Sequence, residues 1–116
     1  MNCDIEKVSF QYSVHIAKVS EDHIVITIRV EYIYHDEVIL SLSSEHYFYI
    51  ENMKDLFVFN GKVLNDHLNL YPNFAGIAYG ATRGMVAVHT AGTKLEARPV
   101  PLIKTSDILS KSVVKK

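Results

Sequence analysis

Cysteine is almost missing from this sequence, and its scarcity excludes a disulfide scaffold. Of the 116 residues, only Cys3 carries a thiol, so no disulfide can close within the chain. A single cysteine also excludes metal sites built from cysteine pairs. These features are typical of a reducing compartment, and we predict a cytoplasmic location.

The chain also lacks an excess of charge and a long hydrophobic run. Twelve Lys and Arg residues against thirteen Asp and Glu give a formal net charge of −1, which provides no electrostatic attraction for nucleic acid or an anionic membrane. The least charged stretch, residues 74–90, is short for a membrane span and has Arg83 in its middle. The N-terminal sequence MNCDIEKV lacks the basic and apolar regions of a secretion signal. We therefore expect neither nucleic-acid binding nor membrane insertion.

Motifs for catalysis or cofactor binding are missing as well. The six histidines show no metal-ligand spacing, and GATRG at residues 80–84 lacks the Gly-Lys-Ser/Thr ending of a phosphate loop. The run SSEH at residues 43–46 alternates in direction along a strand and is not expected to form a triad. His35 and His46 would meet only through strand pairing, and solvated strand histidines are the preferred interpretation. We expect no enzyme activity, no metal and no cofactor.

What the sequence does have is three segments in which apolar and polar residues alternate. They span residues 5–19, 23–34 and 38–51, and their period of two predicts half-buried strands. The connections between them, SED and HDE, are so short that neighbouring strands must be antiparallel. The residues expected to point inward are Val8, Phe10, Tyr12, Val14, Ile16, Ile24, Ile26, Ile28, Val30, Tyr32, Tyr34, Val38, Leu40, Leu42, Phe48 and Ile50.

The regions beside the predicted helix are less regular. Residues 52–70 suggest a short strand, a turn at Asn60-Gly61 and a helical turn. Pro99 and Pro101 are expected to hold the following chain extended. Thr105 or Ser106 can then cap a short last helix, and the final KSVVKK is expected to be a frayed, solvated end.

Residues 72–90 form a predicted helix with almost no charge, which begins at Pro72 and ends before Gly92. With about 100° per residue, one apolar stripe is expected to cover the inner face of the sheet. That stripe consists of Phe74, Ile77, Ala81, Met85 and Val88. The whole chain, residues 1–116, therefore predicts one α+β domain, with an antiparallel sheet of three to four strands followed by a long helix and a short C-terminal helix.

Glycines on this helix indicate self-association. Gly76, Gly80 and Gly84 together weaken it by roughly 3 kcal/mol relative to alanine, so another contact must offset the loss. Missing side chains let a second backbone approach closely. We expect a homo-oligomer whose interface contains Gly76, Gly80, Gly84, Ala87 and Arg83. The alternative is that residues 52–70 or the C-terminal helix cover this side within one chain.

The order of these elements resembles the SecB-like protein-export chaperones. The similarity runs through HIVITIRVEYIYHDEVILSLSSEHYFYI, YPNFAGIAYGATRGMVAV and RPVPLIKTSDIL, about residues 23–110. Its most specific residues are Tyr71-Pro72, Ala78, Arg83-Gly84 and the segment from Pro99 to Pro101.

The resemblance implies an antiparallel sheet backed by two helices, and a tetramer that is a dimer of dimers with the long helix sandwiched inside. It also implies a chaperone that holds unfolded or pre-secretory polypeptides in apolar grooves without a cofactor. The matching groove would involve TKLEARPVPLI, with ordinary core packing as the alternative role for each residue. The candidate peptide-binding residues are Leu95, Val100, Leu102, Ile103, Tyr47 and Tyr49.

Two departures from the family qualify this expectation. The near-zero net charge contrasts with the family's acidic character and argues against docking to the SecA motor. Residues 1–22 are also short for the two N-terminal strands and crossover of longer members, which leaves a changed client-holding role open.

Two other classes of function stay open. The first is an interaction module dedicated to one folded partner, such as a toxin-associated or secretion-associated companion. The second is a small-molecule binder or enzyme such as the hotdog thioesterases, in which the long helix sits within the wrap of the sheet. A deep closed pocket with convergent polar groups would favour the second class.

Overall fold

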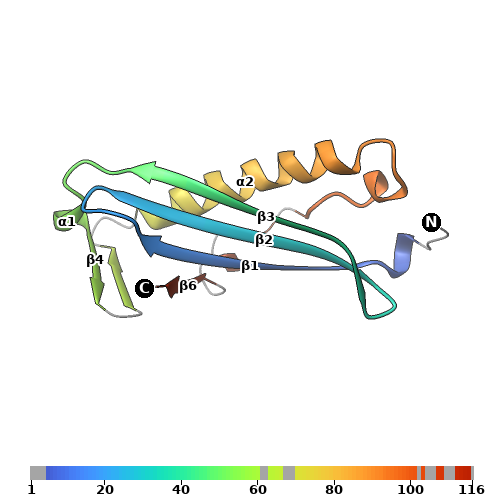
Figure 1. The fold of residues 1–116 in the computed structure, drawn as a ribbon, viewed down its shortest axis with the longest axis horizontal. Helices are drawn as coiled ribbons and strands as arrows, with labels where there is room; N and C mark the ends of the chain where they lie inside the picture. Colours follow the sequence, from blue (N-terminus) through green and yellow to red (C-terminus); the bar gives the residue numbers. More distant parts are fainter. Residues whose placement is uncertain are drawn as a thin grey trace.

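A three-stranded antiparallel sheet with one long helix on its inner face dominates the computed structural model, which describes residues 5–60, 63–66, 70–101, 103, 107–108 and 112–115 (Figure 1). The strands are β1 (Ser9–Lys18), β2 (His23–Tyr34) and β3 (Glu37–Tyr49), and the helix is α2 (Tyr71–Thr90). A short strand, β6 (Ser112–Lys115), pairs in parallel with β1, so the strand order is β3-β2-β1-β6. The α+β prediction is confirmed.

The alternation in β1 and β2 corresponds to the two faces of the sheet. Its inner face is built from β-branched and aromatic side chains that favour a pleated surface, and each large one contributes about 1.5–3 kcal/mol by leaving water. The fully buried members from these strands are Val14, Ile16, Ile24, Ile26, Ile28, Val30 and Tyr32. The predicted strand faces are confirmed here.

The connection between β2 and β3 is a two-residue turn at His35 and Asp36. Their φ angles are 52° and 62°, and two consecutive positive values match the type I′ turn that suits the twist of a hairpin. Next to this turn, the pairing of β2 with β3 shifts by one residue: Ile33 lies opposite Val38, whereas Tyr32 lies opposite Leu40. An irregularity of this kind moves the residues beyond it to the opposite face, so Val38 pairs with Ile33 and is 52% exposed. The prediction that Val38 points inward is wrong for this reason.

A hairpin follows the sheet where a helical turn was expected. The chain makes a short helix α1 (Met53–Leu56), then strands β4 (Phe57–Asn60) and β5 (Val63–Asp66), which pair antiparallel in a separate two-stranded sheet. We expected a helical turn after Asn60, but Val63–Asp66 forms a strand instead, so this prediction is wrong. Gly61 of the predicted turn lies outside the described residues.

The carboxylate of Asp66 provides the start of α2 with its cap. The backbone N–H groups of Leu70 and Tyr71 donate to its two oxygens over 2.9 and 2.6 Å. These groups have no partner inside the helix, and an anion at this end also complements the helix dipole. The predicted helix bounds near Pro72 and Gly92 are confirmed.

Most of the predicted inward stripe of α2 faces away from the core, although Phe74 at its start packs against it. Ile77, Met85 and Val88 are 60%, 41% and 75% exposed. The buried side of the helix carries mostly small side chains. Its residues are Tyr71, Ala75, Ala78, Tyr79, Thr82, Val86 and Thr90. Small side chains allow the helix backbone to approach the sheet closely, and Thr82 brings a hydroxyl that bonds to β3. The stripe prediction is therefore wrong for Ile77, Ala81, Met85 and Val88 and right for Phe74.

The C-terminal region also departs from expectation. Ser112–Lys115, part of the expected frayed tail, forms β6 beside residues Val14 to Ala17 of β1, because backbone pairing to an open edge fixes it in place. Asp107 and Ile108 are helical, whereas the expected cap residues Thr105 and Ser106 lie outside the described residues.

Candidate functional site

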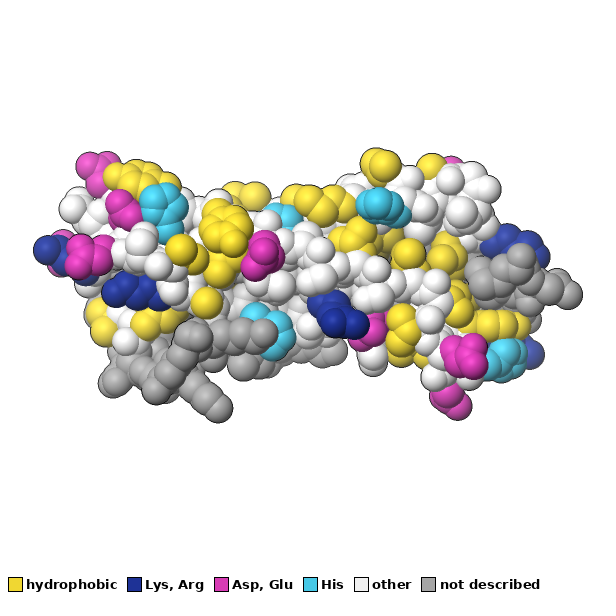
Figure 2. All heavy atoms as spheres, viewed as in Figure 1, with side chains coloured by type: hydrophobic (Ala, Val, Ile, Leu, Met, Phe, Trp, Pro, Cys, Tyr) yellow, Lys and Arg dark blue, Asp and Glu magenta, His cyan; other side chains and the backbone are white. Residues whose placement is uncertain are grey.

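The outer surface of α2 exposes three large apolar side chains, Ile77, Met85 and Val88. We call Ile77, Ala81, Met85 and Val88 the outer stripe. Figure 2 shows hydrophobic side chains along the upper border of the molecule, where α2 lies in Figure 1. Contiguous apolar surface of this kind marks a contact site in soluble proteins.

The glycines lie beside the outer stripe. Gly80, Gly84 and Ala87 are exposed and Gly76 is half-buried. A Cβ atom built on any of the three glycines meets nothing within 4 Å. Within the described chain, no other segment comes close to this flank of the helix. Contacts inside the chain therefore do not explain why side chains are missing here.

Arg83, the only charged residue of α2, is used within the chain. Its Nε donates to the carbonyl oxygen of Val100 over 3.1 Å. The helix thus presents no charged side chain of its own near the outer stripe. Arg83 was expected at the interface between copies, and the structure assigns it an intrachain contact in addition.

The segment after α2 is fastened by side chains rather than by strand pairing. It begins with a 3-10 helix, η2 (Lys94–Ala97), which Thr93 caps by accepting from the N–H of Leu95. The Tyr32 hydroxyl then donates to the carbonyl of Arg98, and the Tyr79 hydroxyl donates to that of Pro101 over 2.9 Å. Because Pro99 and Pro101 have no N–H, this segment cannot form a regular ladder.

Arg98 completes the fastening from the opposite direction. Its Nη2 donates to the carbonyl of Val8 over 3.1 Å, which ties the segment to the residues before β1. Burial raises the pKa of the Tyr32 hydroxyl, and burial followed by repulsion from Tyr12 raises the pKa of Tyr79 much further. Both phenols therefore remain protonated donors at neutral pH.

Two hollows flank this fastened segment. One of about 210 Å³ lies between the segment and α2, and its walls include Arg83, Ala87 and Pro99. The other, of about 320 Å³, lies against the inner face of the sheet. Its lining residues are Phe10, Tyr32, Ala97, Arg98, Pro99 and Pro101. Aromatic and proline walls of this kind suit an apolar side chain of a ligand.

The candidate peptide-binding residues are divided between two faces of the sheet. Leu95 and Val100 are buried in the core and Ile103 packs against it, while Leu102 lies outside the described residues. Tyr47 and Tyr49 are exposed on the outer face of β3. Leu95 and Val100 therefore take the alternative role of core packing; of the three residues on this side, only Val100 also lines a hollow.

The larger hollow is lined partly by the predicted groove segment, residues 93–103, but sequence reasoning missed the two aromatic residues of the sheet that complete it. Phe10 and Tyr32 belong to the inward pattern of β1 and β2, so the alternation assigns them to the core alone. Arg98 directly precedes Pro99, and a residue before proline favours an extended backbone. This dipeptide was the local signal of an extended segment without strand pairing.

A polar cluster joins β3 to α2 under the helix. The Ser44 hydroxyl lies 2.8 Å from Nε2 of His46 and 3.0 Å from the Thr82 hydroxyl, and Nε2 lies 3.2 Å from the latter. Thr82 donates to the carbonyl of Ala78, so its oxygen is free to accept. All three contacts are satisfied when Nε2 of His46 carries the proton and Ser44 donates to Thr82.

His46 is therefore a structural residue and not the solvated histidine that the sequence suggested. Burial lowers the pKa of its imidazole, which keeps the ring neutral at physiological pH. His35 lies in the β2–β3 turn against Tyr34, with ring centroids 4.1 Å apart. The two histidines do not converge.

A second polar group lies at the β1–β2 turn, in open solvent. Asp22 accepts from Nδ1 of His23 at 2.7 Å and from the Ser20 hydroxyl at 2.9 Å, and these bonds lower the pKa of the carboxyl. Both the serine and the aspartate approach the same ring nitrogen, so the group lacks the geometry in which a histidine relays a proton.

Within the described residues, no group of three His, Cys, Asp or Glu side chains is placed to hold a metal ion. No helix in this part of the chain combines the length and apolar character needed to cross a membrane. No family model, curated protein or solved structure matches the chain.

Proposed function

We propose that this protein binds extended segments of other polypeptides and acts as an assembly of its own copies, in the manner of a SecB-like holding chaperone. The observation that carries the proposal is the uncovered apolar surface of α2. Three large side chains are exposed on a helix whose only charged side chain bonds back to its own chain. The proposal includes no catalytic step and no cofactor, and places the protein in the cytoplasm.

The hollow beside Phe10 and Tyr32 is the proposed site for a side chain of the bound polypeptide. Apart from Arg98, whose guanidinium bonds to the carbonyl of Val8, its walls are aromatic and apolar, and the Pro99 to Pro101 segment keeps an extended shape beside it. The carbonyls of that segment are already bonded to Tyr32, Arg83 and Tyr79. Affinity would therefore come mainly from burial of apolar area, which suits clients of varied sequence.

Binding of an unfolded polypeptide is tested with a reduced, carboxymethylated protein, measured as delayed aggregation and as fluorescence anisotropy without nucleotide. Ala97→Phe fills the hollow and is expected to weaken binding at least tenfold. Lys94→Phe adds the same ring to the same turn at a position that does not line it, so its affinity should match that of wild type. Failure of the wild-type protein to bind any unfolded chain would overturn the proposal.

A dedicated folded partner is the second candidate, and the outer face of β3 favours it. Tyr47 and Tyr49 are exposed together, and the Tyr49 ring lies 5.3 Å from that of His23 between centroids. Tyrosine is enriched in protein interfaces. Under this alternative, one stoichiometric partner is retained by the wild-type protein and lost from Tyr47→Ala/Tyr49→Ala, whereas unfolded chains do not bind.

A further inference from the structure

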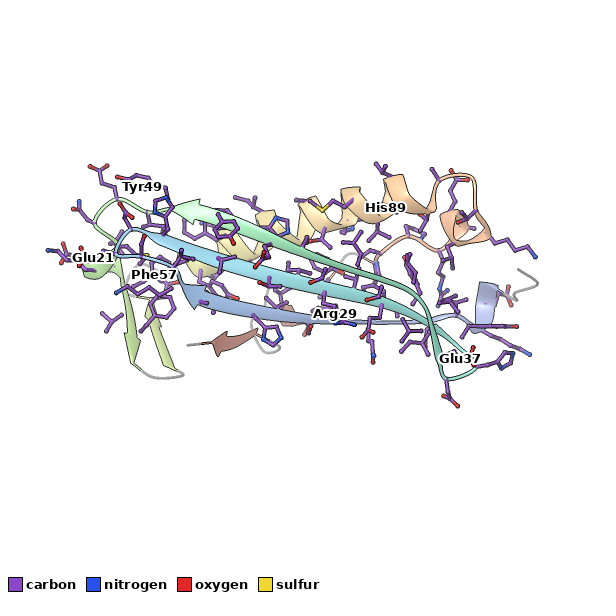
Figure 3. The ribbon with its side chains drawn as sticks, viewed as in Figure 1. Glu21, Arg29, Glu37, Tyr49, Phe57 and His89 are labelled. Carbon is purple, nitrogen blue, oxygen red and sulfur yellow. The ribbon has the colours of Figure 1, made fainter. Side chains whose placement is uncertain are left out.

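β3 forms a long open edge of the sheet. It contains thirteen residues, and no strand of the described chain pairs with its outer side. Soluble proteins protect such edges with lysine, proline or short strands. β3 has no Lys, Arg or Pro, and its one irregularity lies near the β2–β3 turn, between Val38 and Leu40, so its hydrogen-bonding groups are left open from Leu40 to Tyr49. Figure 3 labels its two ends, Glu37 and Tyr49.

The outer stripe lies on the same side of the molecule as this edge. Phe74 of α2 contacts Phe48 of β3, with ring centroids 4.9 Å apart, whereas Tyr79 turns toward Tyr12 of β1. With about 100° per residue, the outer stripe projects on the Phe74 side of the helix. Figure 1 shows α2 along the β3 border of the sheet and β6 at the other border.

We propose that a second copy of this chain pairs its β3 antiparallel with β3 about a two-fold axis at Ser44, which also brings the two outer stripes into contact. This inference deepens the proposed self-association by naming the surfaces that meet. An open edge and an apolar helix flank on one side of a protomer are both covered by a single symmetric contact. An unrelated strand would cover the edge and leave the stripe exposed.

The spacing of the two helices supports this occupant. α2 lies over β2 and β3, so pairing two β3 edges separates the two helix axes by about two strand spacings, or about 10 Å. Packed helices lie 8–10 Å apart. Ala81 and Gly84 at the middle of the contact reduce the bulk between the helices, while Ile77 and Val88 of opposite copies fill the ends.

The charges on β3 select the register. In an antiparallel pair, residues opposite each other must point to the same face of the sheet, so one β3 can slide along the other only in steps of two residues. Each such step moves the two-fold axis by one residue along β3. An axis at Glu45 would place two carboxylates opposite each other, which is unfavourable. An axis at Ser44 places Ser43 opposite Glu45 of the second copy. It also matches the helices, because Thr82 near the middle of the outer stripe lies 3.0 Å from Ser44.

The contact has the size of a specific interface. With the axis at Ser44, residues 39–49 pair over about 37 Å, at about 3.4 Å per residue. The sheet layer over this length and α2 over its 20 residues, about 30 Å at about 1.5 Å per residue, are each about 10 Å deep and give roughly 670 Å² per copy, within the roughly 600–1,000 Å² that specific interfaces bury on each partner.

A pair of charge variants at Ser43 separates this contact from effects within one chain. Inside the protomer, Ser43 pairs with Arg29 of β2. Ser43→Glu therefore stabilises the protomer but places a carboxylate opposite Glu45 of the second copy. Ser43→Lys repels Arg29 but gains Glu45. We expect Ser43→Glu to raise the dimer dissociation constant and Ser43→Lys to lower it, each by about 2- to 30-fold, while the unfolding midpoints move the opposite way.

Cross-linking locates the contact directly. In a Cys3→Ser background, Ser43→Cys places two thiols diagonally across the axis, about 7–8 Å apart, within reach of a short bismaleimide. Gln11→Cys on β1 is the matched control, since five strand spacings alone separate its copies by at least about 24 Å. Cross-linked dimer from Ser43→Cys alone is expected. An oligomer that cross-links equally poorly at both positions overturns the β3 contact and leaves self-association standing, whereas a monomer in solution overturns both.

Discussion

The hydroxyls of Ser44 and Thr82 lie 3.0 Å apart and join the middle of β3 to the middle of α2. Ser44 is 9% exposed and Thr82 is fully buried. This contact fixes the rotation of the helix about its axis, because Thr82 can reach Ser44 only when its own side faces the sheet. The outer stripe is left outside as a result.

Thr82→Val is expected to destabilise the protein by about 1–3 kcal/mol. The substitution keeps the shape of the side chain but leaves the hydroxyl of Ser44 and the ring of His46 without their shared acceptor, and unsatisfied buried polar groups are costly. Urea unfolding followed by circular dichroism measures the change. Ser41→Ala on the exposed face of β3 is the control, and equal midpoints for the two variants would contradict the assigned role.

The stability of the protein should fall as the pH drops below about 6.5. Burial lowers the pKa of His46 in the folded state, whereas the unfolded chain keeps the ordinary value of about 6.5. Below that pH the unfolded state binds more protons, so the free energy of unfolding decreases toward the folded pKa. Urea midpoints at pH 7.5, 6.0 and 5.0 measure the slope. In His46→Gln the slope between pH 7.5 and 6.0 should be smaller, and an unchanged slope would assign it to other groups.

Gly80→Leu is expected to reduce the size of the assembly without harming the fold. A side chain at this position meets nothing within 4 Å in the chain itself, and leucine is the better helix former by nearly 1 kcal/mol. Steric overlap should therefore arise only between copies, with β3-paired dimers remaining. Sedimentation velocity gives the mass, and Lys54→Leu, an exposed position on α1, is the control. An unaltered oligomer would count against an interface at Gly80.

Tyr79→Phe is expected to lower the free energy of unfolding by about 1 kcal/mol. The lost hydroxyl donates to the carbonyl of Pro101 and is one of the side-chain donors that fasten this segment. Proteolysis at Lys94 should also become faster, because local opening of the segment needs less energy. Tyr47→Phe removes the same atom from an exposed ring and should leave both measurements unchanged. The same loss in both variants would refute the fastening role.

The strands could be predicted from the sequence because one face of the sheet is buried along nearly its whole length. Under that condition apolar residues recur at every second position, as Ile24, Ile26 and Ile28 do. The helix bounds could be predicted because Pro72 and Gly92 mark the two ends through their own backbone preferences, which do not depend on distant contacts. Gly92 adopts a φ of 79°, which suits glycine at a helix end.

The side on which α2 meets the sheet could not be predicted by hydrophobicity. That criterion places Ile77 and Val88 inside, whereas the contact depends on close approach by Ala75, Ala78 and a bonded Thr82. The inversion of Val38 depends on a one-residue irregularity, and β6 depends on pairing with a strand about a hundred positions away. Neither leaves a local pattern.

The candidate site was predicted only in outline. The Pro99 to Pro101 segment was predicted to be extended and part of a groove, but the donors that fasten it come from two other elements: Tyr32 from β2, and Tyr79 and Arg83 from α2. In the sequence, Tyr32 fits the alternating pattern of a strand, and Tyr79 and Arg83 fit the pattern of a helix, so none of them signals a bond to a distant segment. Their convergence is a property of the folded chain alone.

The capping of α2 by Asp66 means that the longest helix of the described chain depends on an anion from outside its own sequence. Leu70 and Tyr71 lie only four and five positions from that carboxylate, so the contact closes a short loop and can form early in folding. A synthetic peptide of residues 71–90 would therefore be a poor substitute for the helix in the protein, whereas one that begins before Asp66 would retain the means to nucleate it.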